Sequence, residues 1–100
     1  MSAHKWYDFA GIFVVGRDWF GNDLPNLELR NGTPCTVMIG SDRYADKVSK
    51  ITRSGRHILL EQNGIWSRRK DGRYRPVGGH GNSGYRIVFG FADDYRDPSF

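Results

Sequence analysis

The stretch that decides the fold runs from Arg43 to Arg75 and reads RYADKVSKITRSGRHILLEQNGIWSRRKDGRYR. Three turn signals divide it into short segments: Ser54-Gly55, Asn63-Gly64 and Asp71-Gly72. Asn-Gly and Asp-Gly favour two-residue hairpin turns, because a type I′ turn needs positive φ at both central positions. Three consecutive hairpins predict a four-stranded antiparallel meander.

The rest of the chain has the same punctuation. Thirteen glycines and regularly spaced turn pairs favour short strands over helices. We predict a small all-β domain, either an antiparallel meander in a bent sheet or a partly open SH3-like barrel, because closure removes exposed strand edges. The expected strands are residues 12–15, 27–30, 36–39, 48–53, 57–62, 65–70, 73–77 and 85–91.

One segment allows two interpretations. Ser41 could cap a helix that places Tyr44, Val48 and Ile51 on one face. We favour a turn over residues 41–46 that runs into a strand, because residues 48–53 must pair across Ser54-Gly55.

Length and composition limit the class of protein. One hundred residues make a single domain, in which we distinguish an aromatic-rich part (1–33), the meander (34–91) and a tail (92–100). The single cysteine, Cys35, excludes an internal disulfide and favours a reducing compartment. No segment has the roughly 20 apolar residues of a membrane span, and the N-terminus is not typical of a secretory signal. We therefore expect a cytoplasmic protein without a membrane partner.

Positive charge is concentrated in the meander. Residues 43–75 hold ten basic and three acidic residues, so this stretch carries +7, whereas the whole chain carries +4. A local concentration of charge says more about a binding partner than the net charge does.

Two-residue loops would set the strand registers and sort these charges onto faces. The predicted facing pairs are Lys50–Leu59, Thr52–His57, Glu61–Trp66, Leu59–Arg68, His57–Lys70, Lys70–Arg73, Arg68–Arg75 and Trp66–Val77. Alternation then places one set of side chains in the core: Ile51, Ile58, Leu60, Ile65, Ser67, Tyr74 and Pro76, with Arg53 and Arg69 at the rim. The outer face carries the predicted ligand-binding residues Lys50, Trp66, Arg68, Lys70, Arg73 and Arg75.

This outer face has two interpretations. Like charges directly opposite each other cost up to ~1 kcal/mol per pair, which favours a surface built for an anion, with the Trp66 ring available for a base to stack on. Alternatively, the long cations simply solvate the wet side of the sheet, and their stems cover Trp66 and Leu59.

Other chemistry has little support. The three histidines, His4, His57 and His80, lack the paired spacing of a zinc site, so we expect no metal and no cofactor. Cys35 follows a proline at an expected strand start and is more typical of a small core residue than of a nucleophile. With no catalytic constellation, the sequence favours a binding protein over an enzyme. Trp19-Phe20 lies in a polar context and could cover a subunit interface.

Three short patterns carry a resemblance: GSDRYA at residues 40–45, RRKDGRYR at 68–75 and YRDPSF at 95–100. Their order resembles that of a widespread family of small phage and prophage proteins, over residues 34 to 100. The chain is also similar to phage Thoeris anti-defence proteins, which sequester cyclic ADP-ribose signals. This likeness implies a non-enzymatic, homo-oligomeric protein in the host cytoplasm during infection. The side chains to consider would be Trp66, Arg68, Arg69, Arg73, Tyr95 and Arg96.

The sequence therefore predicts a phage-encoded protein that sequesters an anionic nucleotide or cyclic nucleotide to counter host defence. Two alternatives stay open. One is a general DNA- or RNA-binding module, and the other is an inhibitor that docks on a host defence protein.

Overall fold

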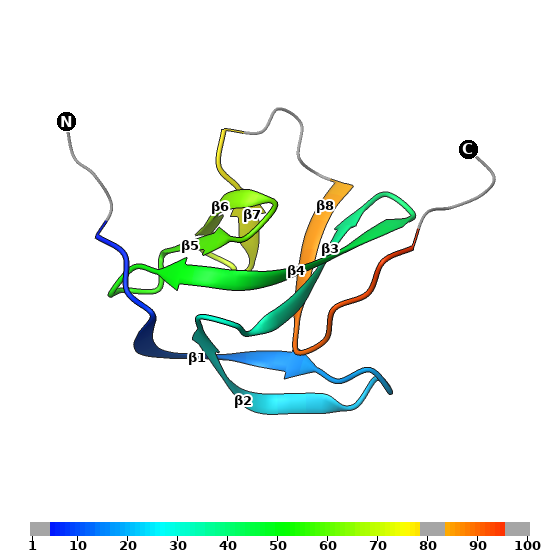
Figure 1. Ribbon diagram of the computed structural model, residues 1–100, viewed down its shortest axis with the longest axis horizontal. Helices are drawn as coiled ribbons and strands as arrows, with labels where there is room; N and C mark the ends of the chain where they lie inside the picture. The colour runs from blue at the N-terminus through cyan, green and yellow to red at the C-terminus, as the bar shows by residue number, and fades with distance from the viewer. Residues whose placement is uncertain (1–4, 79–83, 96–100) are drawn as a thin grey trace.

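Eight β-strands make up the regular structure in a computed structural model that describes residues 5–78 and 84–95 (Figure 1). They are β1 (Phe9–Arg17), β2 (Asp23–Arg30), β3 (Pro34–Ile39), β4 (Asp42–Ile51), β5 (His57–Leu60), β6 (Gly64–Arg68), β7 (Tyr74–Pro76) and β8 (Tyr85–Phe89). No helix long and apolar enough to cross a membrane occurs among the described residues. The predicted all-β class is confirmed.

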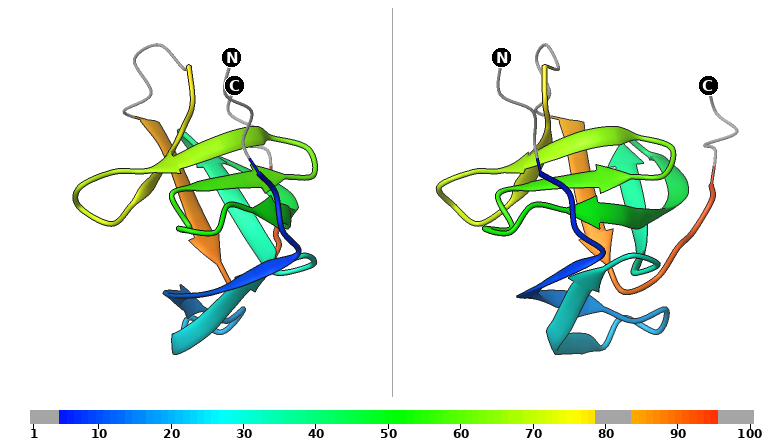
Figure 2. Two further views of the ribbon diagram at one scale, coloured as in Figure 1. Left: turned by 90° about the vertical axis from the view of Figure 1, so that its left-hand side faces the viewer. Right: turned by 60° about the vertical axis from the view of Figure 1, so that its left-hand side comes forward.

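Six strands form one antiparallel sheet in the order β7-β6-β5-β4-β3-β8, and this sheet curls into a nearly closed barrel (Figure 2). β7 and β8 are its two edges and do not pair with each other. β1 and β2 form a separate hairpin that lies across one end of the barrel (Figure 1). The buried core lies inside the barrel and under the hairpin, and its hydrophobic members are Leu29, Cys35, Val37, Val48, Ile51, Ile58, Leu60, Trp66, Tyr74 and Phe89.

β4 is longer than the sequence indicated. It begins at Asp42, which pairs with Ile39, so residues 42–46 belong to a strand and form neither the expected turn nor the alternative helix. Gly40 makes the tight connection possible because its φ of 61° lies in the left-handed region that glycine tolerates. The first half of β4 pairs with β3 and the second half with β5.

The first predicted hairpin is confirmed in its register. Lys50 lies opposite Leu59, and the Thr52 N–H donates to the His57 carbonyl at 3.0 Å. The turn itself differs from the prediction, because the N–H of Gly55 donates to the Thr52 carbonyl at 2.9 Å and the central residues are Arg53 and Ser54, not Ser54 and Gly55.

The other two registers were predicted wrongly. His57 lies opposite Ser67 and not Lys70, and Arg68 lies opposite Tyr74 and not Arg75. No non-glycine residue in the described chain has positive φ, so Asn63 and Asp71 cannot occupy the first central position of a type I′ turn. The loops are residues 61–63 and 70–72, each one residue longer than a type I′ turn, and the left-handed residues are Gly64, which already pairs with Leu60, and Gly72.

A carboxylate on another strand holds the second loop in this form. Asp46 of β4 is 5% exposed and accepts hydrogen bonds from the backbone N–H groups of Gln62 (3.1 Å) and Asn63 (3.0 Å). The side-chain amide of Asn63 also donates to it at 2.6 Å. Such charge-assisted bonds are among the stronger ones in proteins, and this cap comes from 17 residues away.

The two changed registers reverse which side chains of β6 face the core, and they leave the faces of β5 and β7 as predicted. Trp66 points into the core, is 1% exposed, and donates through Nε1 to the Asn63 carbonyl at 3.0 Å. The prediction that Trp66 lies on the outer basic face is therefore wrong. The register change between β5 and β6 reverses the faces once, and the change between β6 and β7 reverses them again. The faces of β7 are therefore as predicted, with Tyr74 buried and Arg73 exposed.

Two glycines bring the hairpin and the barrel close together. Gly16 of β1 lies so near β8 that a Cβ there would come within 2.6 Å of the Phe89 carbonyl oxygen. A Cβ at Gly90 would come still nearer to the Arg17 carbonyl oxygen, and Gly90 has a φ of 118°. Glycine is required where two backbones approach this closely. This crossing fixes where β1 lies relative to β8.

Candidate functional site: an arginine-lined groove

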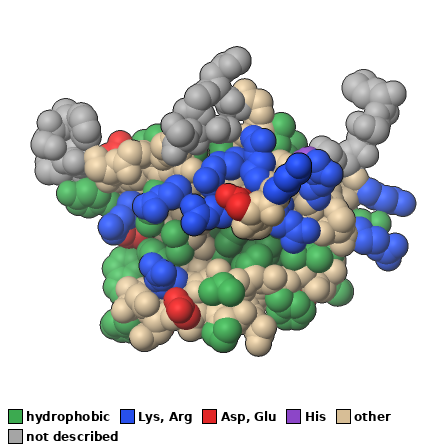
Figure 3. All heavy atoms as spheres, turned by 180° about the vertical axis from the view of Figure 1, so that it is seen from behind, with side chains coloured by type: hydrophobic (Ala, Val, Ile, Leu, Met, Phe, Trp, Pro, Cys, Tyr) green, Lys and Arg blue, Asp and Glu red, His purple; other side chains and the backbone are tan. Residues whose placement is uncertain are grey.

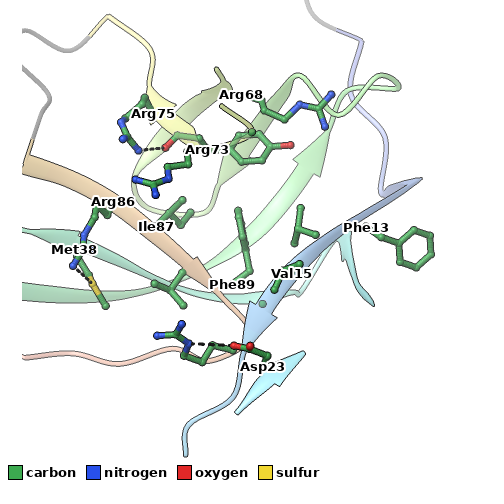
Figure 4. A pocket seen from close by; sticks show the side chains of 16 residues that line it. Phe13, Val15, Asp23, Met38, Arg68, Arg73, Arg75, Arg86, Ile87 and Phe89 are labelled. Carbon is green, nitrogen blue, oxygen red and sulfur yellow. Dashed lines mark hydrogen bonds and ion pairs between the residues drawn. The ribbon is translucent and has the colours of Figure 1, made fainter. Parts of the chain in front are cut away.

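A groove of about 640 Å³ lies where β1, β7 and β8 meet. On one side it is lined by Arg68 and by residues 72–75, on the other by residues 86–89 and Met38, and at its end by residues 13–17 and Asp23. It is open to solvent along its length, and it lies over the two unpaired edges of the barrel (Figure 4).

Two aromatic rings close the barrel beneath the groove. Tyr74 of β7 and Phe89 of β8 meet edge to face, with ring centroids 5.8 Å apart and planes at 83°. The Tyr74 hydroxyl donates to the Gly55 carbonyl. Burial raises the pKa of Tyr74, and the nearby charge of Arg68 opposes that rise. Side chains rather than backbone hydrogen bonds therefore join the two edges.

Backbone groups of β8 also face the groove. The Gly90 N–H donates to the Pro34 carbonyl and the Gly40 N–H to the Gly84 carbonyl, so even-numbered residues of β8 bond to β3. In an antiparallel ladder the alternate residues point their N–H and C=O groups the other way. The backbone groups of Ile87, which lines the groove, thus point toward the β7 side.

Five arginines and one aspartate line the groove, which gives it a local charge of +4. Arg17 is bound to Asp23, with Nε 3.8 Å from Oδ1. In the described part of the chain, no carboxylate oxygen lies within 4.0 Å of the other four, which are Arg68, Arg73, Arg75 and Arg86.

Cations elsewhere on the described surface are more often paired. Five ion pairs occur there, namely Arg17–Asp23, Arg30–Glu28, Arg43–Asp93, Lys47–Glu61 and Lys50–Asp8. Only the first of these lines the groove. On the described surface, cations without such a partner also occur outside the groove, at Lys5, Arg53, Arg56, Arg69 and Lys70, but in the groove they are four of the five arginines.

The four arginines come from three strands and one turn but gather around one space. Arg73 and Arg75 project from the β7 side of the groove, and Arg86 lies on the β8 side beside Met38 (Figure 4). Arg75 donates to the Tyr74 carbonyl at 3.3 Å, and Arg86 contacts the Met38 sulfur at 3.7 Å. Neither contact neutralises a charge, so both guanidinium groups keep most of their donors for another partner.

Seen from behind, the molecule shows a band of Lys and Arg side chains above a lobe with apolar patches (Figure 3). The floor of the groove between these regions is apolar: Val15, Ile87 and Phe89 lie there, below the arginines (Figure 4). The groove therefore offers positive charge along one side and hydrophobic surface along the other.

The structure brings together three of the residues predicted from sequence: Arg68, Arg73 and Arg75 line the groove. Five others lie elsewhere. Lys50 is bound to Asp8, Trp66 is in the core, and Arg69 and Lys70 are exposed in the β6–β7 turn. Tyr95 pairs through its backbone with Arg43 on the other side of β3. Arg96 lies outside the described residues.

Sequence reasoning missed Arg86 and the apolar floor. Arg86 was within an expected strand, but nothing in the sequence indicated that the last strand returns beside β7. The only available signal was barrel closure itself, since a meander that closes must bring its ends together. The position of Val15 depends on the β1–β8 crossing, which involves backbone contacts that no local pattern encodes.

Cys35 is 0% exposed on β3, and burial, with a smaller effect from the Asp46 charge, raises the pKa of its thiol. We expect no reaction with Ellman's reagent at pH 8 until urea unfolds the protein. The raised pKa also makes stability depend on pH. The thiol of the unfolded chain loses its proton near pH 9.0, whereas the buried thiol keeps it. The free energy of unfolding therefore has its full value below pH 9 and decreases as the pH rises above it. Urea midpoints from pH 7 to 10 should fall more steeply for the native chain than for Cys35→Ala, and rapid labelling of the folded protein would contradict this.

No cluster of three or more His, Cys, Asp or Glu side chains suited to a metal occurs among residues 5–78 and 84–95. Comparison of the chain with protein-family models, curated proteins and solved structures found no match. The groove must therefore be interpreted from its own geometry.

Proposed function

We propose that this chain is a non-enzymatic binding protein that holds a phosphate-bearing, nucleotide-type anion in the arginine-lined groove. The observation that carries the proposal is the gathering of Arg68, Arg73, Arg75 and Arg86 around one space, with no carboxylate partner among the described residues. Like charges held close together cost free energy unless an anion joins them.

Arginine suits phosphate in particular. Its planar guanidinium group presents parallel N–H donors that match two phosphate oxygens, and it stays charged at any physiological pH. Arg73 and Arg75 on one side and Arg86 on the other would contact a phosphate group from both sides of the groove (Figure 4). The outward N–H of Ile87 adds a backbone donor on the same wall.

The apolar floor supports a ligand with a ring as well as a phosphate. Val15, Ile87 and Phe89 offer hydrophobic surface on which a base can lie. Trp66, the ring predicted from sequence for this role, is buried and cannot serve. The volume of about 640 Å³ lies within the usual range for small-molecule sites, roughly 300–1,000 Å³.

The biological role that we propose is sequestration of a nucleotide signal to blunt a host defence. This part rests on the resemblance of GSDRYA, RRKDGRYR and YRDPSF to phage proteins and on the similarity to Thoeris anti-defence proteins. A protein that only holds its ligand needs a groove of suitable charge and shape. The arginine-lined groove has both.

The binding proposal is tested by reversing groove charges. We expect Arg73→Glu with Arg86→Glu to weaken binding of cyclic ADP-ribose and of a labelled cyclic dinucleotide by at least ~100-fold, since each hydrogen bond to a charged group contributes about 1.5–3 kcal/mol. Isothermal titration calorimetry measures the affinity. The matched control is Arg69→Glu with Lys70→Glu, which changes the net charge equally in the neighbouring turn and should cost less than tenfold.

Two results would argue against the groove. If both double variants weaken binding equally, the effect is one of net charge alone. If the Arg73/Arg86 variant binds as the native chain does, the ligand lies elsewhere. Inorganic phosphate should compete only weakly, because it lacks the ring that the apolar floor accepts.

A second candidate is single-stranded nucleic acid, favoured by the open shape of the groove and by Arg56, Arg69 and Lys70, which continue the positive band along the hairpin turns. A polyanion releases counterions on binding, so its affinity falls steeply with salt. A small nucleotide shows a shallow slope. Titrating a labelled oligonucleotide and a labelled cyclic dinucleotide from 50 to 300 mM salt separates the two candidates.

A further inference from the structure

The outer side of strand β1 exposes a row of apolar side chains beside the groove. Phe9, Phe13 and Val15 alternate along this strand, with exposures of 57%, 57% and 71%. A single exposed apolar residue is ordinary, whereas several that lie together mark a binding surface. Phe13 and Val15 also line the arginine-lined groove. The row on β1 is therefore continuous with the groove.

The Phe13 ring stands at the end of the groove. Val15 lies below the arginines, whereas the ring of Phe13 points out of the groove (Figure 4). Side chains on the same side of a strand are ~6.6 Å apart, about twice the ~3.4 Å rise between stacked bases. A flat base therefore has room to lie against the Phe13 ring.

A glycine keeps the other side of this ring open. Gly11 lies between Phe9 and Phe13 on the exposed side of β1, where the hairpin register shifts and φ is 68°. A Cβ at Gly11 would meet no atom within 4 Å. Glycine inside a strand marks a bulge or a place where a ligand approaches closely. Both features leave the space between the two phenylalanines accessible.

Charge is divided between the two sides of the groove. On the hairpin side, Glu28 lies opposite Phe13 and is bound to Arg30 at 3.4 Å, and Asp23 is bound to Arg17 at 3.8 Å. These carboxylates are therefore neutralised by their own neighbours. The positive band and the apolar patches below it lie on the same face of the molecule (Figure 3). An anionic ligand on this face would find its charge partners on the arginine side and aromatic rings on the β1 side.

We propose that the outer side of β1, with Phe13 as its central ring, is a base-stacking platform that extends the groove for single-stranded nucleic acid. The platform depends on the proposed function, because it needs a phosphate-bearing nucleotide in the groove. One nucleotide of the strand places its phosphate among the arginines and its base on the apolar floor, and the next base stacks on Phe13. Proteins that hold single strands without reading their sequence combine a positive groove with exposed aromatic rings in this way.

Other nucleic-acid ligands use this surface less well. The bases of a duplex are stacked and paired, so they cannot lie on a protein ring. A lone nucleotide covers the apolar floor and leaves Phe13 without a ring to bind. We therefore expect the affinity to rise when a second nucleotide is joined to the first, and to depend little on the identity of the bases.

Removal of the Phe13 ring tests the platform. We expect Phe13→Ala to raise the dissociation constant for a labelled oligothymidylate of about six nucleotides by roughly 5- to 150-fold, the usual effect of losing one base–aromatic stack. Fluorescence anisotropy measures it. For thymidine 3′,5′-bisphosphate, which has one base only, calorimetry should show a change of less than about twofold. Phe20→Ala is the matched control, because Phe20 is 86% exposed at the hairpin tip, outside the row, and its loss should leave both affinities unchanged.

Two further variants separate stacking from general apolar contact. Phe13→Tyr keeps the ring and should bind the oligonucleotide as the native chain does, whereas Phe13→Leu keeps an apolar side chain and should lose most of the affinity that Phe13→Ala loses. Thermal melting checks that each variant is folded. The platform is excluded if the native chain binds the oligonucleotide no more tightly than the bisphosphate, or if Phe13→Ala or Phe13→Leu binds it as the native chain does.

The groove and the platform can fail separately. The Arg73→Glu, Arg86→Glu variant should weaken binding of both the oligonucleotide and the bisphosphate, because both place a phosphate in the groove. If this variant binds both as the native chain does, the proposed function is wrong and the platform is not an extension of the groove. If it weakens both while the Phe13 variants change neither, the groove is supported and the platform alone is overturned.

Discussion

Replacing Trp66 by alanine is expected to remove a large part of the stability of the fold. Trp66 is 1% exposed at the centre of the barrel, and its indole N–H is bound to the Asn63 carbonyl. Truncating a fully buried tryptophan typically costs about 3–5 kcal/mol. A domain of this size has only about 5–15 kcal/mol in total. Urea unfolding followed by circular dichroism should show a greatly reduced midpoint, or a protein already partly unfolded in buffer.

Trp19→Ala provides the matched control. Trp19 is 61% exposed and makes an edge contact with Phe91, whose loss costs about 0.5–1.5 kcal/mol. The comparison also tests where the ligand binds. A Trp66→Ala protein that stays stable but no longer binds a nucleotide would mean that Trp66 lies on the ligand surface, as the sequence alone had predicted.

Replacing Gly90 by alanine should have the next largest effect. A Cβ at this position would overlap the Arg17 carbonyl group, and both atoms belong to backbone that cannot easily move. The φ of 118° adds strain for any residue with a side chain. Together we expect a loss of about 3–5 kcal/mol, which lowers the melting temperature by more than ~15 °C.

Gly32→Ala separates the two causes. Gly32 has a φ of 96°, but a Cβ there would meet no atom within 4 Å, so only the cost of the backbone conformation applies, about 1–2 kcal/mol. Equal losses for Gly90→Ala and Gly32→Ala would mean that β1 and β8 are not in close contact. The end wall of the groove would then not be held as described, since this crossing positions β1 against β8.

Much of the fold follows from local signals. The turn residues at Ser54-Gly55, Asn63-Gly64 and Asp71-Gly72 all lie at strand connections. The alternation around Ile58 and Leu60 identifies the inward side of β5, and Tyr74 was correctly placed in the core. These features depend on neighbouring residues, and the sequence displays such neighbours directly.

The errors come from residues far apart in the chain. Asn-Gly favours a two-residue turn when only local propensity acts, but the Asp46 carboxylate binds the N–H groups of Gln62 and Asn63 and favours a longer loop. One extra residue reverses the faces of a strand, because side chains alternate with a period of two. That single tertiary contact moves Trp66 from the predicted ligand surface into the core.

The candidate site shows the same division. The sequence by itself determined that the chain is all-β, that its positive charge is concentrated in residues 43–75, and that Arg73 and Arg75 point outward. Only the tertiary structure decided which cations face one another. Barrel closure brings Arg86 of the last strand beside β7, and the close approach of Gly16 and Gly90 sets β1 beneath them. Charge and turn chemistry are local properties of a sequence, whereas register and closure depend on contacts between distant strands.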